Sequence, residues 1–318
     1  FMIFFSMERM KEMVKIIATA ESVEQAEQLL EAGVDQLYIG NDDFGLRLPN
    51  SFSNEEIETI TKLAHSQDKE VIIAVNGLMH NEHIESITPY LQFLERINVD
   101  GITLGDPGVV QVMRNQKIEL PFIYDAQTLV TSARQVNFWA KRGAVGAVLA
   151  RELTWEELQQ IRRQVEVPLE ILVYGATCIH QSKRPLVKNY FSFIDEKEDT
   201  SKERGLFLAE PKRKDTHYSI YEDKNGTHIF ATDDVNLLPF VDDLFNVNYD
   251  RWKLDGIFTK GERFVEIVKL FVRAKRELEE GTFTTDLKLA LNEQLMNLHP
   301  VERSLSEGFY SKDPSEVQ

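Results

Sequence analysis

Cysteine is almost absent from this sequence, since Cys178 is the single one among 318 residues. A lone thiol excludes a disulfide within the chain, and it excludes a zinc or iron–sulfur centre built from this chain's cysteines alone. Chains without disulfides are typical of reducing compartments. We therefore expect a cytoplasmic protein that holds no metal or cluster by its own thiols.

Positive charge is scarce as well. Lysine and arginine number 36 against 52 aspartates and glutamates, and the formal net charge is -16. The field of the whole molecule repels nucleic acid, so contact with RNA needs a local basic patch or a more basic partner. Lys183, Arg184 and Lys188 form one such cluster, and residues 212–214 form another. Short charge clusters are also typical of solvated surface, and both interpretations stay open.

Long hydrophobic runs are missing too. The apolar opening, Phe1 to Phe5, is far shorter than the ~20 residues of a membrane span. It has no basic segment before it and no small-residue cleavage site after it, so it does not resemble a secretory signal. Met7 and Met10 are candidate natural starts, and we interpret residues 1–12 as an N-terminal extension. We expect a soluble protein without membrane contact.

Strand-like and helix-like segments alternate regularly from residue 13 to residue 281. Helix caps separate the apolar runs, with Ser53 and Thr154 each followed three residues later by glutamate. This alternation predicts an α/β fold, the (β/α)₈ barrel, and the absence of a Gly-x-Gly-x-x-Gly loop disfavours a doubly wound sheet. The eight predicted strands are 14–20, 35–40, 70–77, 101–106, 121–128, 144–150, 169–175 and 252–258.

Regularity lapses at about 188–235, which we interpret as an insertion into the barrel. Residues 217–223 and 227–233 alternate around Asn225-Gly226, the strongest hairpin signal in the chain. After the barrel, residues 282–318 form a tail. Its amphipathic stretch 287–298 predicts a helix that packs on the barrel or on a partner.

Polar residues follow nearly every predicted strand, whereas the strand bodies are apolar. Carboxyl ends of barrel strands meet at one face, so this pattern predicts a ligand-binding mouth. Singly, each residue is also explained as a helix cap or a loop hydrogen bond. Arg47 and Arg151 are suited to grip a carboxylate or phosphate, although Arg151 is equally well explained by a salt bridge to Glu152 or another barrel carboxylate. The candidates are Asn41, Arg47, Asn76, His80, Asp106, Asp125, Gln127, Arg151, Glu152, Tyr174, Cys178 and Lys260.

The stretch from Glu170 to Phe191 has the highest density of potentially reactive side chains. A buried strand breaks at Gly175, and then come Cys178, His180, Lys183 and Arg184. The thiol is either a nucleophile beside His180 or a small buried hydrophobe, and no third orienting residue is evident. No HExxH or GxSxG pattern is present. A metal site would require His80 or His83 to converge on Cys178 and His180, and we expect none.

Glu170, the run Tyr174-Gly175-Ala176-Thr177-Cys178 and Ser182 resemble the signature of the collagenase-like peptidase family, peptidase family U (member thirty-two). Thr177 stands at the signature's hydrophobic position, and Pro185 stands about where a second cysteine belongs. The resemblance covers most of residues 14–281. The signature residues Glu170 and Cys178, together with the neighbouring His180, are our catalytic candidates. Lys183 and Arg184 of the basic cluster are among the substrate-binding candidates.

The resemblance implies a role in 5-hydroxylation of the tRNA wobble uridine, beside a longer paralogue, with contact to tRNA through a local basic patch of this chain or through that partner. Several family members hold an iron–sulfur cluster on four cysteines, of which only Cys178 matches here. One thiolate cannot hold a cubane, so we expect no cofactor from this chain alone. A cysteine or metal-dependent peptidase and a non-catalytic scaffold that binds a small acid remain the alternatives.

Overall fold

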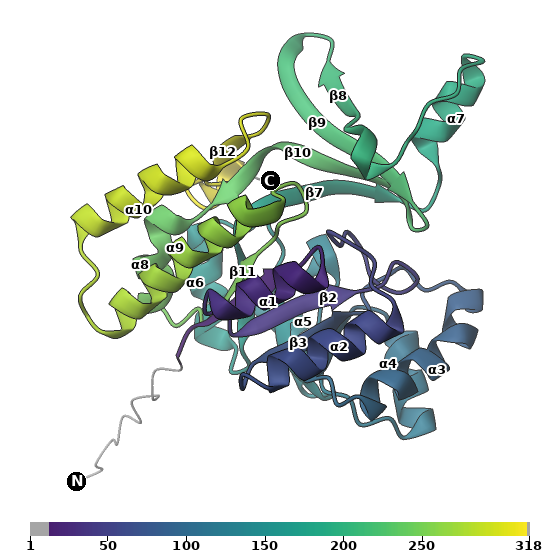
Figure 1. The fold of residues 1–318 in the computed structure, drawn as a ribbon, viewed down its shortest axis with the longest axis horizontal. Coiled ribbons are helices and arrows are strands. Elements are labelled where there is room, and N and C mark those ends of the chain that lie inside the picture. Colours follow the sequence, from purple (N-terminus) through teal and green to yellow (C-terminus); the bar gives the residue numbers. More distant parts are fainter. Residues whose placement is uncertain (1–12, 317–318) are drawn as a thin grey trace.

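A computed structural model of the chain describes residues 13–316, and the predicted N-terminal extension lies outside them. In the described part, eight parallel strands pair in sequence order, and β11 closes the ring by pairing with both β1 and β7 (Figure 1). The predicted (β/α)₈ barrel is therefore confirmed. The barrel strands are β1 (Lys15–Thr19), β2 (Gln36–Gly40), β3 (Glu70–Ala74), β4 (Gly101–Leu104), β5 (Phe122–Tyr124), β6 (Ala144–Val148), β7 (Leu169–Ser182) and β11 (Arg251–Leu254).

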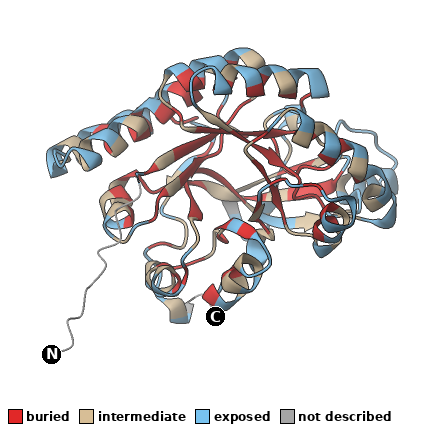
Figure 2. Ribbon diagram, turned by 90° about the horizontal axis from the view of Figure 1, so that it is seen from below, coloured by how far each residue is buried: buried red, intermediate tan, exposed pale blue. Residues whose placement is uncertain are grey.

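Helices surround the barrel, with buried strands inside and exposed helix faces outside (Figure 2). Both predicted capping boxes form: Ser53 with Glu56 begins α2, and Thr154 with Glu157 begins α6. These caps fix where the chain turns from a strand end into a helix, which keeps the strand-end loops in place. The covering helices are α1 (Val23–Glu31), α2 (Asn54–His65), α3 (Asn81–Arg96), α4 (Pro107–Gln116), α5 (Ala133–Ala140), α6 (Trp155–Gln164), α8 (Val241–Asn246) and α9 (Gly261–Glu279).

The predicted end of the seventh strand at Gly175 is wrong, because β7 continues to Ser182. Gly175 has a φ of 124°, and a Cβ there would overlap the carbonyl oxygen of Asp255. The glycine therefore serves a close approach between two strands instead of a turn. Beyond it, β7 leaves the barrel and pairs antiparallel with β10 (Gly226–Asn236).

Residues 183–236, here called the arm, stand beside the barrel (Figure 1). The predicted hairpin is confirmed, with β9 (Arg213–Asp223) paired to β10. Asp223 pairs with Gly226, so the two loop residues are Lys224 and Asn225. The arm also contains α7 (Leu186–Phe193) and β8 (Phe207–Glu210), which the sequence pattern did not predict.

The tail folds back on the barrel. The amphipathic stretch lies in α10 (Thr285–Leu298), which packs on α9 and buries Leu291 and Leu295. After it, β12 (Ser304–Ser306) pairs with β10. Among residues 13–316, no helix combines the length and the apolar character that crossing a membrane requires.

Candidate functional site at the mouth of the barrel

A cavity opens at the carboxyl ends of the barrel strands, and we call it the mouth cavity. It encloses about 650 Å³ of empty space, counted with its open entrance. Side chains from separate strand ends meet there, as expected for this fold. Its lining residues are Tyr38, Leu46, Arg47, Asn76, Asp125, Gln127, Thr128, Val148, Leu149, Arg151, Glu152, Glu170, Thr177, Cys178, Lys253 and Asp255.

Asn76, which follows the carboxyl end of β3, holds one wall of the mouth cavity together. Its Nδ2 donates to Asp125 Oδ2 at 2.6 Å and to the Tyr38 hydroxyl at 3.2 Å, while its Oδ1 accepts from the Leu46 amide at 3.0 Å. The Tyr38 hydroxyl also lies 2.9 Å from Thr103 Oγ1. All these groups are buried, so the network holds this wall in one arrangement before any ligand arrives.

A buried ion pair forms the floor of the mouth cavity. Lys253 Nζ lies 3.3 Å from Glu170 Oε1 and 3.2 Å from the centre of the Tyr38 ring. Burial raises the pKa of the Glu170 carboxyl, although Lys253 opposes this. Glu170 is therefore held in place and able to take up a proton more readily than an ordinary glutamate.

Two guanidinium groups line the cavity from opposite sides. Arg47 Nη1 donates to Gln181 Oε1 at 2.8 Å, and Arg47 itself has a φ of 53°. Arg151 donates to the Ala176 carbonyl, and its Nη2 lies 3.5 Å from Asp255 Oδ2. The salt bridge considered for Arg151 thus goes to another barrel carboxylate and not to Glu152. A left-handed backbone at a non-glycine residue costs energy, and such strain often accompanies functional positions.

Cys178 lies on the part of β7 that extends past the barrel, with His228 of β10 nearby. His228 is fully buried, and its Nε2 lies 2.9 Å from Asp223 Oδ1. Burial raises the pKa of the Cys178 thiol, but the neighbouring imidazole of His228 and the charge of Arg47 outweigh it, and the net pKa is lowered. Burial lowers the pKa of His228, but Asp223 and Cys178 reverse this, and the net pKa is raised. These shifts favour a thiolate beside an imidazolium.

Some buried polar atoms of the mouth cavity have no partner. Gln127 Nε2 and Thr177 Oγ1 both lack a hydrogen bond among the described residues. Gln127 also has a left-handed backbone, with a φ of 60°. Unpaired buried polar atoms cost stability unless a ligand or water satisfies them. The cavity therefore presents free hydrogen-bonding groups to whatever enters it.

The structure brings together eight of the predicted site residues and leaves the others outside the mouth cavity. The eight are Arg47, Asn76, Asp125, Gln127, Arg151, Glu152, Glu170 and Cys178. Tyr174 points elsewhere, since its hydroxyl contacts Thr259 Oγ1 at 2.9 Å and His299 Nδ1 at 2.8 Å. His80 and Asp106 are N-caps of α3 and α4, and Asp106 accepts from the Gly108 amide at 2.6 Å.

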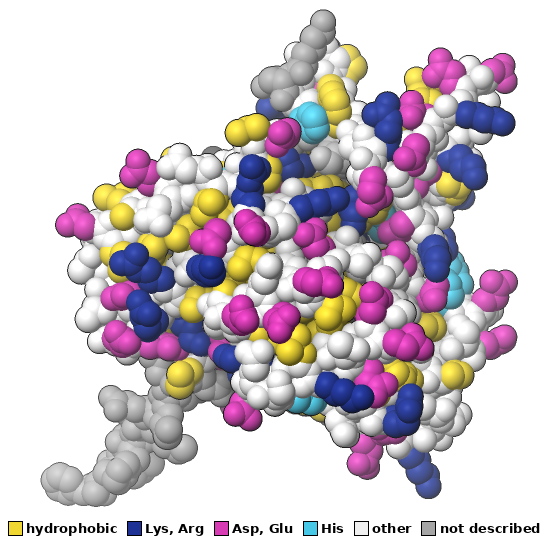
Figure 3. Space-filling view, viewed as in Figure 1, with side chains coloured by type: hydrophobic (Ala, Val, Ile, Leu, Met, Phe, Trp, Pro, Cys, Tyr) yellow, Lys and Arg dark blue, Asp and Glu magenta, His cyan; other side chains and the backbone are white. Residues whose placement is uncertain are grey.

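His180 contributes its main chain to the site: its carbonyl accepts from Cys178 Sγ at 3.3 Å, while its side chain is exposed. The imidazole beside the thiol belongs to His228 instead. Lys183 bonds the carbonyl of Lys224 at 2.7 Å, and Arg184 is exposed next to it. On the face drawn in Figure 3, basic and acidic side chains are interspersed, so that face carries no patch of one sign.

Sequence reasoning missed four residues of the site: Tyr38, Lys253, Asp255 and His228. The first three sit in or next to predicted strands, and a lysine inside the apolar run 252–258 is a usable signal of an inward polar position. His228 lay within the predicted hairpin, but nothing local ties it to Cys178. Their proximity depends on the length of β7 past Gly175.

Comparison with known proteins finds relatives of this chain. The profile of Peptidase family U32 matches residues 21–318. tRNA hydroxylation protein P2 of Bacillus subtilis (strain 168) is 33% identical over 303 residues, covering 94% of this chain and 98% of that protein. tRNA hydroxylation protein P1 of the same organism is 23% identical, covering 76% of this chain and 58% of that protein. The solved structure of the U32 peptidase Mk0906 is 17% identical with a TM-score of 0.51, covering 78% of this chain and 94% of that one, a likeness of fold alone.

Proposed function

This chain belongs to peptidase family U32, and we propose that it acts in the hydroxylation of tRNA, at C5 of a wobble uridine, beside a paralogous subunit. The observation that carries the proposal is the similarity to tRNA hydroxylation protein P2, which extends over nearly the whole of both chains. A mouth cavity with arginines, unpaired donors and an activated thiol is compatible with a polar heterocycle as the ligand.

A groove next to the mouth cavity supports contact with RNA. It spans about 1240 Å³, counted with the solvent-open space above it, and Arg151 and Thr177 line both hollows. Basic and aromatic side chains both line it, namely Arg213, Tyr218, Phe309 and Lys312. Stacking on aromatic rings and attraction to phosphates are how proteins hold unpaired nucleotides. An unpaired anticodon loop would then lie along the groove while its base enters the cavity.

An iron–sulfur cluster does not fit the residues of this chain. Cys178 is its single thiol, and among residues 13–316 no three His, Cys, Asp or Glu side chains are grouped as a metal site requires. We derive no step through such a group. The paralogous subunit that we propose, like P1 of Bacillus subtilis beside P2, is where a cluster would be sought.

Deletion of the gene tests the function. We expect 5-hydroxyuridine-derived nucleosides in bulk tRNA to fall, measured by mass spectrometry of digested tRNA from a strain without a redundant paralogue. Complementation with Arg151→Met should fail, because that cation lies between cavity and groove. Arg142→Met, whose guanidinium stacks on Phe138 at the surface, should complement. Unchanged nucleosides after deletion would refute the proposal.

A cysteine peptidase is the second candidate, and the Cys178, His228 and Asp223 arrangement is what favours it. It predicts that purified protein cleaves gelatin, and that Cys178→Ala abolishes the cleavage. Absence of cleavage above a blank without protein would dismiss it.

A further inference from the structure

The Cys178 thiol is built into a relay of side chains that tRNA recognition alone does not require. Asp223 at the end of β9 orients His228 through Nε2 at 2.9 Å, and His228 lies fully buried between the strands of the arm. Cys178 pairs with Phe230 in the β7–β10 ladder, two positions along β10 from His228. The relay therefore depends on the antiparallel extension of β7.

The second ring nitrogen of His228, Nδ1, is unpaired. It makes no hydrogen bond within the described residues, and the Cys178 thiol donates to the carbonyl of His180 at 3.3 Å. Leaving a ring nitrogen buried and unpaired is costly. Transfer of the thiol proton to Nδ1 removes that cost, because an imidazolium N–H then faces a thiolate. Thr177 and Gln127 extend the set of unpaired buried atoms into the adjoining mouth cavity.

We propose that Cys178 is the nucleophile that adds to C6 of the pyrimidine whose C5 is hydroxylated, with His228 as the acceptor of the thiol proton and Asp223 as the residue that positions His228. This inference rests on the proposed function and names a catalytic residue for it. The thiol proton moves to His228 Nδ1, and the sulfur forms a bond to C6. The electron pair of the C5=C6 double bond moves onto C5 and the C4 carbonyl oxygen. C5 then takes a proton from water.

The chemistry of the base explains why a thiol is needed. C6 of uracil is the β-carbon of an unsaturated carbonyl system, so it accepts a thiolate, and the addition makes C5 electron-rich. The mouth cavity offers donors to the C4 carbonyl oxygen of the ring, where negative charge develops. Arg47, Arg151, Gln127 and Thr177 all line it and can each donate a hydrogen bond.

Reversal of the addition gives a direct test without any hydroxyl donor. When the thiolate leaves, C5 loses one of its two protons, so hydrogen at C5 exchanges with solvent. We would incubate the full chain, in its complex where one forms, with tRNA from the deletion strain that carries tritium at C5 of uridine. Release of tritium into water is expected, and Cys178→Ala should reduce it to background.

Histidine variants separate the relay from general folding effects. His228→Gln should lower the tritium release at least about tenfold, as loss of a proton acceptor does. His65→Gln is the matched control, since His65 Nε2 also lies 2.9 Å from a carboxylate, Asp100 Oδ2, but lines no part of the mouth cavity. Its release should equal that of the wild type. Equal loss in both variants would overturn the assigned role of His228.

Alkylation by iodoacetamide is the second measurement, and it needs no RNA. The rate should reach half its maximum below the ordinary thiol pKa of ~8.5, and His228→Gln should move that midpoint upward. If the thiol is reactive and the tRNA binds, yet no tritium is released, addition to C6 is overturned while the proposed function stands. If deletion of the gene leaves the tRNA nucleosides unchanged, the proposed function itself is refuted, and this inference falls with it. The titratable and charged groups that face the thiol are His228, Tyr221, Asp223, Arg47, Arg151 and Asp255.

Discussion

Two buried histidines of this protein each lie near a carboxylate, yet their pKa values are displaced in opposite directions. His228 faces Asp223, and although burial lowers its pKa, the hydrogen bond to Asp223 and the neighbouring Cys178 thiol raise it overall. Burial lowers the pKa of His299, and Asp234, 4.0 Å away, does not reverse this. The difference lies in Arg303, whose Nη2 already binds Asp234 Oδ1 at 2.6 Å.

A carboxylate raises the pKa of a neighbouring histidine effectively only when it is not already paired with a stronger cation. Around His299, the guanidinium of Arg303 neutralises Asp234, and the Tyr174 hydroxyl lies 2.8 Å from Nδ1. That cluster ties the tail to β7 and β10. Around His228, the second nitrogen is left for the thiol. One histidine is thus structural, and the other is suited to proton transfer.

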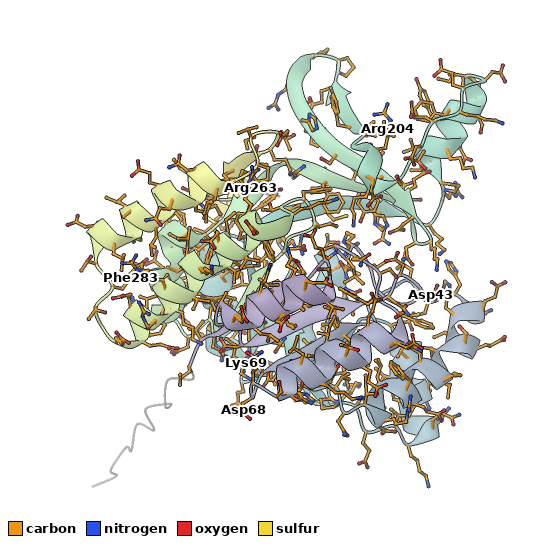
Figure 4. All side chains as sticks on the ribbon, in the orientation of Figure 1. Asp43, Asp68, Lys69, Arg204, Arg263 and Phe283 are labelled. Carbon is orange, nitrogen blue, oxygen red and sulfur yellow. The ribbon has the colours of Figure 1, made fainter. Side chains whose placement is uncertain are left out.

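Of the substitutions that test this difference between the histidines, removal of Arg303 should have the largest effect on stability. Arg303→Met leaves Asp234, which is 1% exposed, as a buried charge without its guanidinium, and we expect a loss of about 3–5 kcal/mol in the free energy of unfolding. Urea titration measures it. The matched control is Arg204→Met on the arm (Figure 4), where the 2.8 Å pair with Glu198 is solvent-exposed and should contribute little to stability. Similar losses in both variants would contradict the argument.

Gly175 separates the two histidine clusters, since Tyr174 precedes it and Cys178 follows it on β7. Gly175→Ala should cost about 3 kcal/mol, because the left-handed φ is strained for alanine and the new Cβ meets the backbone of Asp255. Gly205→Ala is the control: its φ is 68° but nothing lies within 4 Å, so about 1 kcal/mol is expected. Thermal unfolding of both variants measures these losses. Equal shifts in Tm would refute the role of Gly175 in the close approach to Asp255.

The barrel could be predicted from the sequence because each strand–helix unit is local, with its own apolar run and cap. Seven site residues followed from the rule that strand ends meet, among them Arg47, Asp125 and Arg151. What could not be predicted depends on long-range geometry. Gly175 resembles a turn signal until Asp255 is placed against it, and His228 meets Cys178 only through the β7–β10 pairing.

The smallest expected effect is on the pH dependence of stability, which should differ between the two histidines. The raised pKa of His228 means that its contribution is complete below the ordinary value of about 6.5 and is lost as pH rises through the folded value. The lowered pKa of His299 has the opposite sign, with stability present above about 6.5 and lost as pH falls.

His228→Gln and His299→Gln, each compared with its parent by urea unfolding across pH 5 to 8, should therefore give stability differences that slope in opposite directions. Both substitutions are made in a chain that keeps Cys178, because the raised pKa of His228 depends on Cys178 as well as on Asp223. Slopes of the same sign would mean that Arg303 does not neutralise Asp234 as the geometry indicates. The distinction between a structural and a reactive histidine would then have to rest on Cys178 alone.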